Sequence, residues 1–402
     1  MDWSPKQDLA LKKGREWFNS RSKKPFILNG VAGTGKTTLA RHFAEGVGKE
    51  VAFCAFTGKA ASVMRQSGCQ NATTIHQLIY TSAERSRRKI RELNEKIAEA
   101  SGREKKELEK ELRREEELAS QPMFHRKPTE ALSHLGLVIV DECSQVDNKI
   151  GDDLMSFGVP VLVLGDPAQL PPIKGGGYFQ RQEADIFLDE IHRQAKGNPI
   201  IELATDVREG RRLRPGQYGD SCVTTASPTP EEFISHDMVL VGRNSTRSAC
   251  NRWFRQSQRR PSIYPVAGDK LVCLKNNHER GILNGEIWRA ASNAQLVEGE
   301  KRDSTFPIVV DIDDEEGREH EEVPMLPQYF VGREETISPW EKRVEVECFD
   351  WGYCLTVHKA QGSQWASVLI NDEGRCFGRH YRRWLYTAIT RAAERVTVKL
   401  ND

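Results

Sequence analysis

The sequence predicts an α/β protein built on two parallel sheets. Short runs of β-branched and aromatic residues recur along the chain and alternate with helical patterns. Such alternation is typical of parallel sheets, and the number of runs suffices for two of them. The first run leads into a glycine-rich loop, and a later run ends in two adjacent acids. The runs are FILN, VAFCAF, LGLVIVDE, VPVLVLGD, DMVLVG, SVLIND and RVTVKL.

Composition and charge describe a globular chain with more than one domain. The sequence has 402 residues, of which 38% are hydrophobic and 29% are charged, so two or three domains with separate cores are expected. The formal net charge is only +1, so a polyanionic partner would need a local basic groove. No segment approaches the ~20 apolar residues of a membrane span, so we expect a cytoplasmic protein. The nine cysteines include no CxxC pair, which argues against a zinc ribbon or a disulfide framework.

Breaks in the strand–helix alternation divide the chain into units. We expect one sheet domain over residues 1–82 and 121–185, and a second over residues 186–285 and 346–402. The change between them falls near the turn-rich, polar stretch EGRRLRPGQYGD.

Two insertions interrupt these domains. Residues 83–120 are almost wholly charged and carry a few apolar residues at helical spacing, which predicts a helical hairpin with a narrow apolar seam. Residues 286–345 carry short β-type runs around an acidic turn, which predicts a small β-barrel insertion.

The glycine-rich loop predicts a binding site for a nucleoside triphosphate. Residues 30–37 match G-x-x-x-x-G-K-[ST] directly after a predicted strand and before a predicted helix, which is the context that this motif needs. The glycines let backbone N–H groups curl around a phosphate, and the helix N-terminus adds its dipole. Lys36 would neutralise the terminal phosphates, and the hydroxyl of Thr37 would bind Mg²⁺. The predicted ATP-binding residues of the loop are Gly30, Gly33, Thr34, Gly35, Lys36, Thr37 and Thr38.

Two later strands end in residues that would complete this site. The run LVIV delivers Asp141 and Glu142 to the C-terminal edge of the sheet, where open α/β sheets bind ligands. We expect Asp141 to hold Mg²⁺ and Glu142 to accept a proton from the attacking water. The next strand leads into GDPAQLPP, where Gln169 could contact the γ-phosphate. Together these residues predict an ATPase, although two adjacent acids could also cap a helix.

Seven segments, from FTGKAA to LYTAITRAAERV, together resemble the superfamily 1 helicases, in particular the RecD-like and phage Dda-like group that moves 5′ to 3′ on single-stranded DNA. The segments stand in the order of that family and extend nearly to the end of the chain. The resemblance implies two RecA-like P-loop domains. The segments are FTGKAA, TTIHQL, DECS, GDPAQLPP, IHRQ, LTVHKAQGSQW and LYTAITRAAERV.

The same resemblance implies three more residues at the nucleotide. Gln7, in SPKQ, matches the glutamine that reads adenine. Arg193 and Arg391 match the two arginines that reach the γ-phosphate from the second domain. Such arginines make hydrolysis depend on closure of the cleft between the domains, whereas ordinary surface arginines would have no such effect.

The resemblance also implies a groove for a nucleic-acid strand, formed by both sheet domains. Short hydroxyls, amides and imidazoles suit contacts with phosphate and sugar, which position a strand without reading its sequence. Trp365, Trp288 and Phe56 are possible stacking platforms for bases, although each could instead be a core residue. The strand-binding candidates are Thr57, Lys59, Thr74, His76, Asn284, Thr356, His358 and Gln361.

The two insertions have counterparts in the family. Residues 83–120 lie where relatives carry a strand-separating pin or wedge, but they lack an obvious aromatic or apolar tip. Residues 286–345 lie where the group has a small SH3-like insertion.

The predicted function is an ATP-dependent DNA helicase that moves 5′ to 3′ on single-stranded DNA and opens forks, and we expect it to be monomeric. Two alternatives stay open. One is an RNA-directed motor, since nothing in the sequence reads the 2′-hydroxyl. The other is a nucleotide-gated module that docks a replication or recombination protein through residues 83–120.

Overall fold

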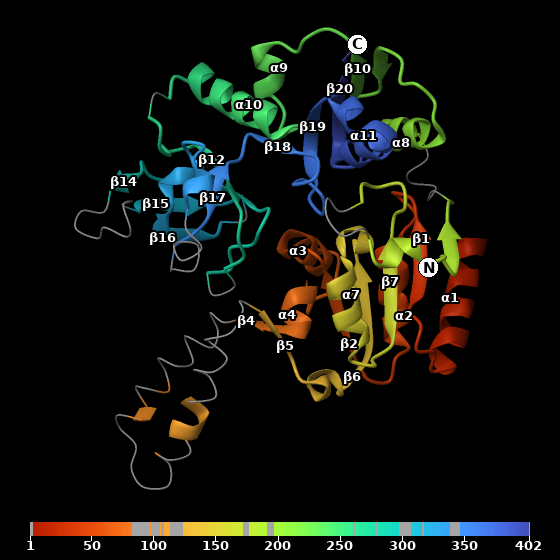
Figure 1. Ribbon diagram of the computed structural model, residues 1–402. Coiled ribbons are helices and arrows are strands. Elements are labelled where there is room, and N and C mark those ends of the chain that lie inside the picture. The colour runs from red at the N-terminus through yellow and green to blue at the C-terminus, as the bar shows by residue number, and fades with distance from the viewer. Residues whose placement is uncertain are drawn as a thin grey trace.

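The structure is a computed structural model, and it describes most of the chain. The described residues are 3–82, 93, 96–97, 105, 108–112, 124–171, 177–190, 197–260, 262–277, 280–296, 307–315, 317–337 and 346–401. Figure 1 shows two α/β units, one above the other, with a third sheet beside them.

The first unit is built on a parallel sheet of six strands in the order β3-β2-β6-β7-β1-β8. Its strands are buried because helices cover both faces, which is the usual arrangement for parallel sheets. One face packs around Ile27 and Val140, and the other around Leu28 and Ile139. The strands are β1 (Phe26–Gly30), β2 (Glu50–Ala55), β3 (Thr73–Thr74), β6 (Leu135–Asp141), β7 (Val161–Gly165) and β8 (Ile186–Leu188). The helices are α1 (Pro5–Asn19), α2 (Lys36–Glu45), α3 (Gly58–Gln66), α4 (Ile75–Ile79) and α7 (Asn148–Met155).

The second unit is built on another sheet of six strands, in the order β18-β11-β19-β20-β10-β9. Five of its strands are parallel, but the edge strand β9 runs antiparallel to β10, so the sheet is not purely parallel as predicted. The strands are β9 (Gly216–Tyr218), β10 (Ser221–Thr224), β11 (Met238–Val241), β18 (Cys354–Thr356), β19 (Trp365–Asn371) and β20 (Ala392–Lys399). The helices are α8 (Pro199–Glu209), α9 (Pro230–Ile234), α10 (Asn244–Ser257) and α11 (Tyr381–Ile389).

The third sheet is antiparallel, in the order β14-β15-β13-β12-β17, with β16 paired to β15. Its core is formed around Trp288, which is 0% exposed, and Phe349. The strands are β12 (Lys270–Cys273), β13 (Ile287–Ala290), β14 (Gln295–Leu296), β15 (Ile308–Asp313), β16 (Glu319–Met325) and β17 (Phe349–Trp351).

Buried ion pairs attach the third sheet to α10 of the second unit. The guanidinium of Arg255 binds Asp269, which is 0% exposed and precedes β12. Asp269 also accepts a hydrogen bond from the hydroxyl of Tyr353 at 2.7 Å. On the neighbouring strand β17, which pairs with β12, Asp350 forms an ion pair with Arg247 of α10. Burial of this kind is tolerated only where the charges are paired and hydrogen-bonded, so the β12–β17 edge of the sheet is firmly held against α10.

The strand pairing corrects two predicted boundaries. The boundary after residue 185 would place β8 in the second unit, but β8 pairs with β1, so the first sheet extends to Leu188. The predicted insertion 286–345 is also too short for the third sheet, since β12 lies before it and β17 after it. The chain enters this sheet through β12 and leaves it through β17, and these two strands are hydrogen-bonded neighbours, so both belong to it.

The predicted helical hairpin lies largely outside the described residues. Two short strands, β4 (Tyr80–Ser82) and β5 (Phe124–Arg126), pair antiparallel, so Ser82 and Phe124, which flank this segment, lie opposite each other. The described residues between 93 and 112 are helical.

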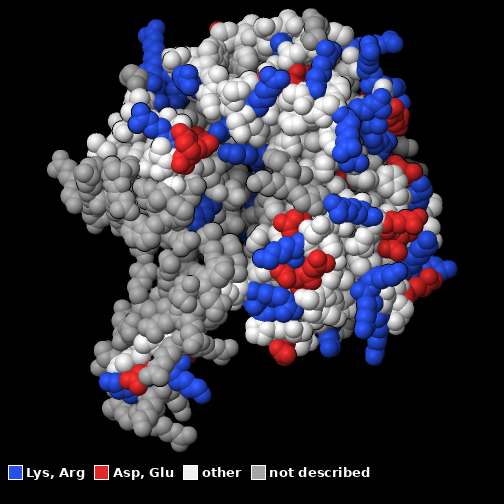
Figure 2. All heavy atoms as spheres, viewed as in Figure 1, with Lys and Arg blue, Asp and Glu red and all other residues white. Residues whose placement is uncertain are grey.

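The surface agrees with the balanced composition. On the face shown in Figure 2, Lys and Arg side chains lie over both α/β units with Asp and Glu among them. Among the described helices, none combines the length and the apolar character that crossing a lipid bilayer requires. None of the nine cysteines takes part in a disulfide.

Candidate functional site

The glycine-rich loop has the shape that its sequence predicts. It joins β1 to α2, and Gly33 and Gly35 adopt left-handed backbone angles with φ of 78° and 72°. Other residues rarely adopt such angles, so these glycines allow the loop to curl back over the start of α2. The Nζ atom of Lys36 donates to the carbonyl oxygens of Gly30 and Val31 at 2.8 and 3.1 Å, so the lysine lies along the loop.

Close packing requires a glycine at the end of β1. A Cβ atom on Gly30 would lie 2.8 Å from Oγ1 of Thr34 and 2.9 Å from Cβ of Leu188. The hydroxyl of Thr34 is itself committed to the carbonyl of Val31 at 2.8 Å. Thr34 therefore shapes the loop with its side chain, while Thr38 lies in the first turn of α2.

The side chain of Gln7 lies against this loop. Its Nε2 atom donates to the carbonyl of Thr34 at 3.1 Å, and its Oε1 atom accepts from the backbone of Ser4 at 2.9 Å. Ser4 caps α1 in return, so a capping box fixes the glutamine. The structure therefore places Gln7 beside the phosphate loop.

The acids predicted for Mg²⁺ and for proton transfer lie at the end of β6. The hydroxyl of Thr37 donates to Oδ2 of Asp141 at 2.8 Å, so two hard oxygen ligands of the kind that Mg²⁺ prefers are together. The next residue, Glu142, has a left-handed backbone with φ of 51°, which is uncommon outside glycine. Its N–H donates to Oδ1 of Asp141 at 2.7 Å. Burial raises the pKa of Glu142, while Arg391 opposes that shift.

A cavity of about 300 Å³ joins these residues to the second unit. Nη1 of Arg391 lies 3.9 Å from Oε1 of Glu142 across it. The arginine is held by the carbonyls of Thr387 and Ser363 at 3.1 and 3.2 Å. Residues from both units therefore face one space. The predicted site residues that line it are Gly33, Lys36, Thr37, Asp141, Glu142, Gln169 and Arg391.

Two predicted residues of this site need separate mention. The Oε1 atom of Gln169 is buried and has no hydrogen-bond partner among the described residues, as expected of a group that awaits a ligand. Arg193 lies outside the described residues, so its role stays a prediction.

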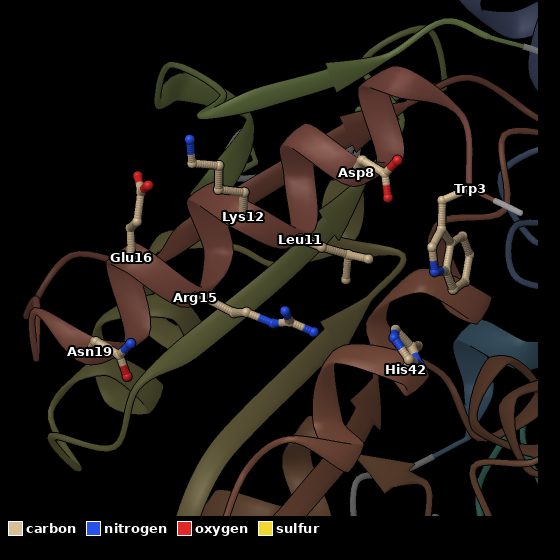
Figure 3. A pocket seen from close by; sticks show the side chains of 8 residues that line it. All are labelled: Trp3, Asp8, Leu11, Lys12, Arg15, Glu16, Asn19 and His42. Atoms are coloured by element: carbon tan, nitrogen blue, oxygen red, sulfur yellow. The ribbon is translucent and has the colours of Figure 1, made fainter. Parts of the chain in front are cut away.

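A second hollow, of about 410 Å³, lies between α1 and α2 and contains none of the predicted site residues. Figure 3 shows that Trp3 and His42 face each other at one end of it. Their ring centroids are 5.3 Å apart.

Three of the strand-binding candidates lie close together where the units meet. Thr57 caps α3 and Lys59 lies in its first turn. A Cβ atom on Gly285, the residue after Asn284, would lie 3.7 Å from Cβ of Lys59. A Cβ atom on Gly362 would lie 3.0 Å from the hydroxyl of Thr57. The start of α3, a turn of the third sheet and the second unit therefore converge.

Other strand-binding candidates are turned toward the protein itself. Thr74 is 2% exposed, and its hydroxyl caps α4 through the backbone of Gln77 at 3.1 Å. Thr356 is 6% exposed, and its hydroxyl accepts from the backbone of Lys359 at 3.4 Å. Neither side chain reaches a groove surface in this structure, because both hydroxyls serve their own backbone.

Gln361 also departs from its predicted place. It is 4% exposed, and its Nε2 atom donates to the carbonyl of Leu170 at 2.9 Å. Gln361 therefore joins the second unit to the first instead of facing a strand.

The aromatic and imidazole candidates have mixed outcomes. Trp288 is 0% exposed in the core of the third sheet, so its assignment as a stacking platform is wrong. Phe56 and Trp365 are half-buried. The ring of His76 packs on Phe56 and that of His358 on Phe377, and burial lowers the pKa of both histidines.

Sequence reasoning missed one residue of the interface between the units. The hydroxyl of Tyr386 on α11 donates to Oδ2 of Asp166 at 2.6 Å and accepts from the N–H of Ala32 at 3.0 Å. The signal was present, since Tyr386 stands in the same LYTAITR segment that supplied Arg391.

Comparisons with known families agree with this division. The AAA domain family matches residues 15–221, more than half of the 402-residue chain. The UvrD-like helicase C-terminal domain matches residues 352–398. The first match covers the phosphate loop and the acids, and the second covers α11 and Arg391.

Two curated relatives are similar in sequence. The ATP-dependent RecD2 DNA helicase of Deinococcus radiodurans is 26% identical over 384 residues, which are 92% of this chain and 46% of that protein. The ATP-dependent DNA helicase dda of Enterobacteria phage T4 is 27% identical over 199 residues, which are 46% of this chain and 38% of that protein. The chain thus spans less than half the length of these relatives.

Solved structures show the same fold. The Pif1 helicase from Candida albicans is 18% identical with a TM-score of 0.52, over 100% of this chain and 95% of that chain. The Bacteroides Pif1 helicase in complex with ADP-AlF3 and ssDNA is 16% identical with a TM-score of 0.51, over 99% of this chain and 92% of that chain. Both units therefore have the RecA-like arrangement of a helicase core. The chain belongs to the AAA domain family, and its similarity to the RecD2 and dda helicases and to the UvrD-like helicase C-terminal domain supports a superfamily 1 helicase of the RecD- and Dda-like kind.

Proposed function

We propose that this protein is an ATP-dependent DNA helicase that moves 5′ to 3′ along single-stranded DNA and separates duplex DNA. The observation that carries the proposal is the pair formed by Arg391 and Glu142, which approach to 3.9 Å from different units across one cavity. A site divided in this way completes itself only when the two units close, so hydrolysis and movement are linked. The relatives named RecD2 and dda are ATP-dependent DNA helicases, which supports this reading.

The residues at the cavity have separate roles in hydrolysis. Glu142 accepts a proton from the water that attacks the γ-phosphorus, and ADP is the leaving group. Lys36 and Arg391 offset the negative charge that spreads over the γ-phosphoryl oxygens. Thr37 and Asp141 would hold Mg²⁺, which supplies further charge neutralisation between the phosphates. Gln169 and the glycines position the phosphates, and Gln7 lies at the edge of the loop where it would read the adenine.

Movement follows from two groove halves that belong to different units. Thr57 and Lys59 belong to the first unit, whereas Asn284 lies in a turn of the third sheet, which is attached to the second unit, and His358 lies in the second unit itself. Closure around ATP would move one half past the other, and reopening after product release would reset them. The half-buried side chains of Trp365 and Phe56 are candidates for stacking with bases.

Separation of the strands requires a wedge, and we propose residues 83–120 for this role. The β4–β5 ribbon pairs Ser82 with Phe124, the described residues that flank this segment, which supports an insertion that leaves and re-enters the first unit at one place. Opening one base pair costs roughly 1.4 kcal/mol of stacking free energy on average. A protein that moves along a single strand does not meet this cost, whereas a protein that unwinds a duplex must. We also propose that residues 270–351 form an SH3-like insertion, since their strands pair as one antiparallel sheet.

The test compares two duplexes that differ only in the polarity of a single-stranded tail. We expect ATP-driven opening of the duplex with a 5′ tail and none of the duplex with a 3′ tail. Opening of the 3′-tailed duplex alone would contradict the direction. ATP hydrolysis would also be measured with single-stranded RNA and DNA of equal length. If only the RNA stimulated hydrolysis, the protein would be assigned as an RNA-directed motor instead.

A matched pair of variants tests whether the cavity drives the reaction. Lys36→Ala should abolish hydrolysis and opening but leave binding of single-stranded DNA measurable, because Lys36 lies in the phosphate loop. Lys24→Ala, at an exposed lysine before β1, should retain both activities. Loss of strand binding in Lys36→Ala would contradict the separation of the two sites.

A further inference from the structure

Tyr386 makes a direct contact between the second unit and the phosphate loop. Its side chain extends from α11 into the first unit and is 2% exposed. The hydroxyl donates to Asp166 at 2.6 Å and accepts from the backbone N–H of Ala32 at 3.0 Å. Ala32 belongs to the loop that curls around the phosphates, and it lines the nucleotide cavity.

The chemistry of the contact fixes the direction of both hydrogen bonds. A phenol can donate once and accept as well, whereas a carboxylate only accepts. Asp166 is 5% exposed, and its other oxygen accepts from the backbone of Ala168 at 3.0 Å. Burial beside Asp166 raises the pKa of Tyr386, so the hydroxyl stays protonated and remains a donor. Loss of the hydroxyl would remove a hydrogen bond from a carboxylate oxygen of the buried Asp166 and another from the partly buried N–H of Ala32.

Two further contacts hold the segment that follows Asp166. The hydroxyl of Thr387 accepts from the backbone of Leu170 at 2.9 Å. Gln361 donates to the carbonyl of the same Leu170 at 2.9 Å. Side chains of the second unit thus hold both ends of the segment that carries Gln169, whose Oε1 atom is buried in the nucleotide cavity.

The same helix end carries the arginine that faces Glu142. Nε of Arg391 donates to the carbonyl of Thr387, the residue after Tyr386, at 3.1 Å. A displacement of the loop at Ala32 would therefore move α11 and Arg391 through contacts of about 3 Å each. Coupling between two sites requires a structural element whose conformation both sites can shift, and α11 contacts both the loop and Arg391.

We propose that Tyr386 is a positioning residue that couples the occupancy of the phosphate loop to the closure of the second unit. The inference rests on the proposed function, and it assigns the regulation of that same site. Without the hydroxyl, the loop can still bind the phosphates through Lys36 and Thr37, but a movement of the loop is no longer transmitted to α11.

The experiment uses two tyrosines of the same helix. Tyr386→Phe removes only the hydroxyl between the units. Tyr381→Phe is the matched control, because its hydroxyl donates to Asp372 at 2.8 Å within the second unit. Thermal unfolding of both variants checks that each is folded.

The first measurement is closure in the absence of DNA. Fluorophores on the first and second units report closure as a non-hydrolysable ATP analogue is added, and a fluorescent nucleotide reports binding separately. In the wild type and in Tyr381→Phe, closure should follow binding. In Tyr386→Phe, half-closure should need at least about tenfold more analogue than half-binding does.

The second measurement is the number of base pairs opened per ATP hydrolysed, which should fall in Tyr386→Phe and stay within about twofold in Tyr381→Phe. Closure that tracks binding equally in all three proteins would overturn the inference. A wild type that closes on the analogue but opens no duplex would instead contradict the proposed function, so the two failures are distinguishable.

A second variant covers the case in which Tyr386→Phe does not fold. Asp166→Asn keeps an oxygen that can accept from Tyr386 but removes the charge. Asp166→Asn should raise the analogue concentration needed for half-closure, relative to that for half-binding, by a smaller factor than Tyr386→Phe does. A ratio no larger than that of Tyr381→Phe would count against the coupling.

Discussion

The hydroxyl of Thr37 donates to a carboxylate oxygen of Asp141 across 2.8 Å, although 104 positions separate the two residues in the chain. One is at the start of α2 and the other at the end of β6, so the sheet itself brings the pair together. Both groups offer oxygen ligands at the place where the phosphate loop would present a triphosphate.

The first prediction concerns this pair. Thr37→Val keeps the shape of the side chain and removes the oxygen, so we expect kcat for ATP hydrolysis to fall by roughly 10²-fold or more. Steady-state hydrolysis and nucleotide binding with Mg²⁺ and with EDTA would be measured. In EDTA the variant should bind nucleotide as the wild type does. A variant with wild-type kcat would show that Thr37 is not a ligand of Mg²⁺.

The second prediction concerns Glu142 as the base. Glu142→Gln should lower kcat by about 10² to 10⁴-fold, because the amide cannot accept the proton. Burial raises the pKa of this carboxyl, so the wild-type rate should fall on acidification at a higher pH than an ordinary glutamate would give. A pH–rate profile tests this. An acid limb at the ordinary pKa of a glutamate would contradict the assignment.

The same variant should be as stable as the wild type or more stable at neutral pH. A carboxyl whose folded pKa is raised binds more protons in the folded chain than in the unfolded chain, so stability falls as pH rises through that interval. Glu142→Gln removes this cost. Thermal unfolding at acidic and at neutral pH would show the gain at neutral pH only.

The third prediction concerns Arg391 and separates two of its effects. Arg391→Gln should lower the rate of hydrolysis by about 10³-fold or more, as loss of an arginine finger does. It should also move the acid limb of the remaining activity to higher pH, because Arg391 lowers the pKa of Glu142. Arg395→Gln is the control, since that arginine binds the carbonyl of Ser235 away from the cavity. Equal rates for the two variants would refute the role of Arg391.

The fourth prediction distinguishes a core tryptophan from a stacking platform. Trp288→Ala should lower the free energy of unfolding by about 3 to 5 kcal/mol, because the indole is 0% exposed among Phe349 and other core residues. Denaturant unfolding would measure this loss. Trp288→Phe should recover much of it. Weaker DNA binding without any loss of stability would point instead to a surface role for Trp288.

The geometry of the glycine-rich loop and of the acids beside it was largely predictable because its signals are local in the sequence. The spacing of Gly30, Gly35 and Lys36 fixes a loop whatever the rest of the fold, and two acids after a buried strand must reach the same sheet edge. The structure accordingly brings Asp141 to Thr37.

The strand groove was harder to predict, since hydroxyls and amides also serve the backbone. Thr74 with Gln77 has the spacing of a capping box, which the sequence could have shown. The contact of Gln361 with Leu170 depends on how two units meet, and no local pattern records that. The strand β8 was assigned to the wrong unit. It has only three residues, which is too short a pattern to show that its partner strand is β1.

The attachment of the third sheet has a mechanical consequence. Buried charge pairs at Asp269 and Asp350 tie its first and last strands to α10, so the sheet and the second unit should rotate as one rigid body. The same sheet approaches the first unit, because a Cβ atom on Gly58 of α3 would lie 2.9 Å from Cβ of Leu283. A small rotation about the nucleotide site would therefore produce a larger displacement at the part of the third sheet that lies farthest from that site. If the protein is the helicase proposed above, the work done on DNA depends on the stiffness of the two ion pairs as well as on the chemistry of ATP.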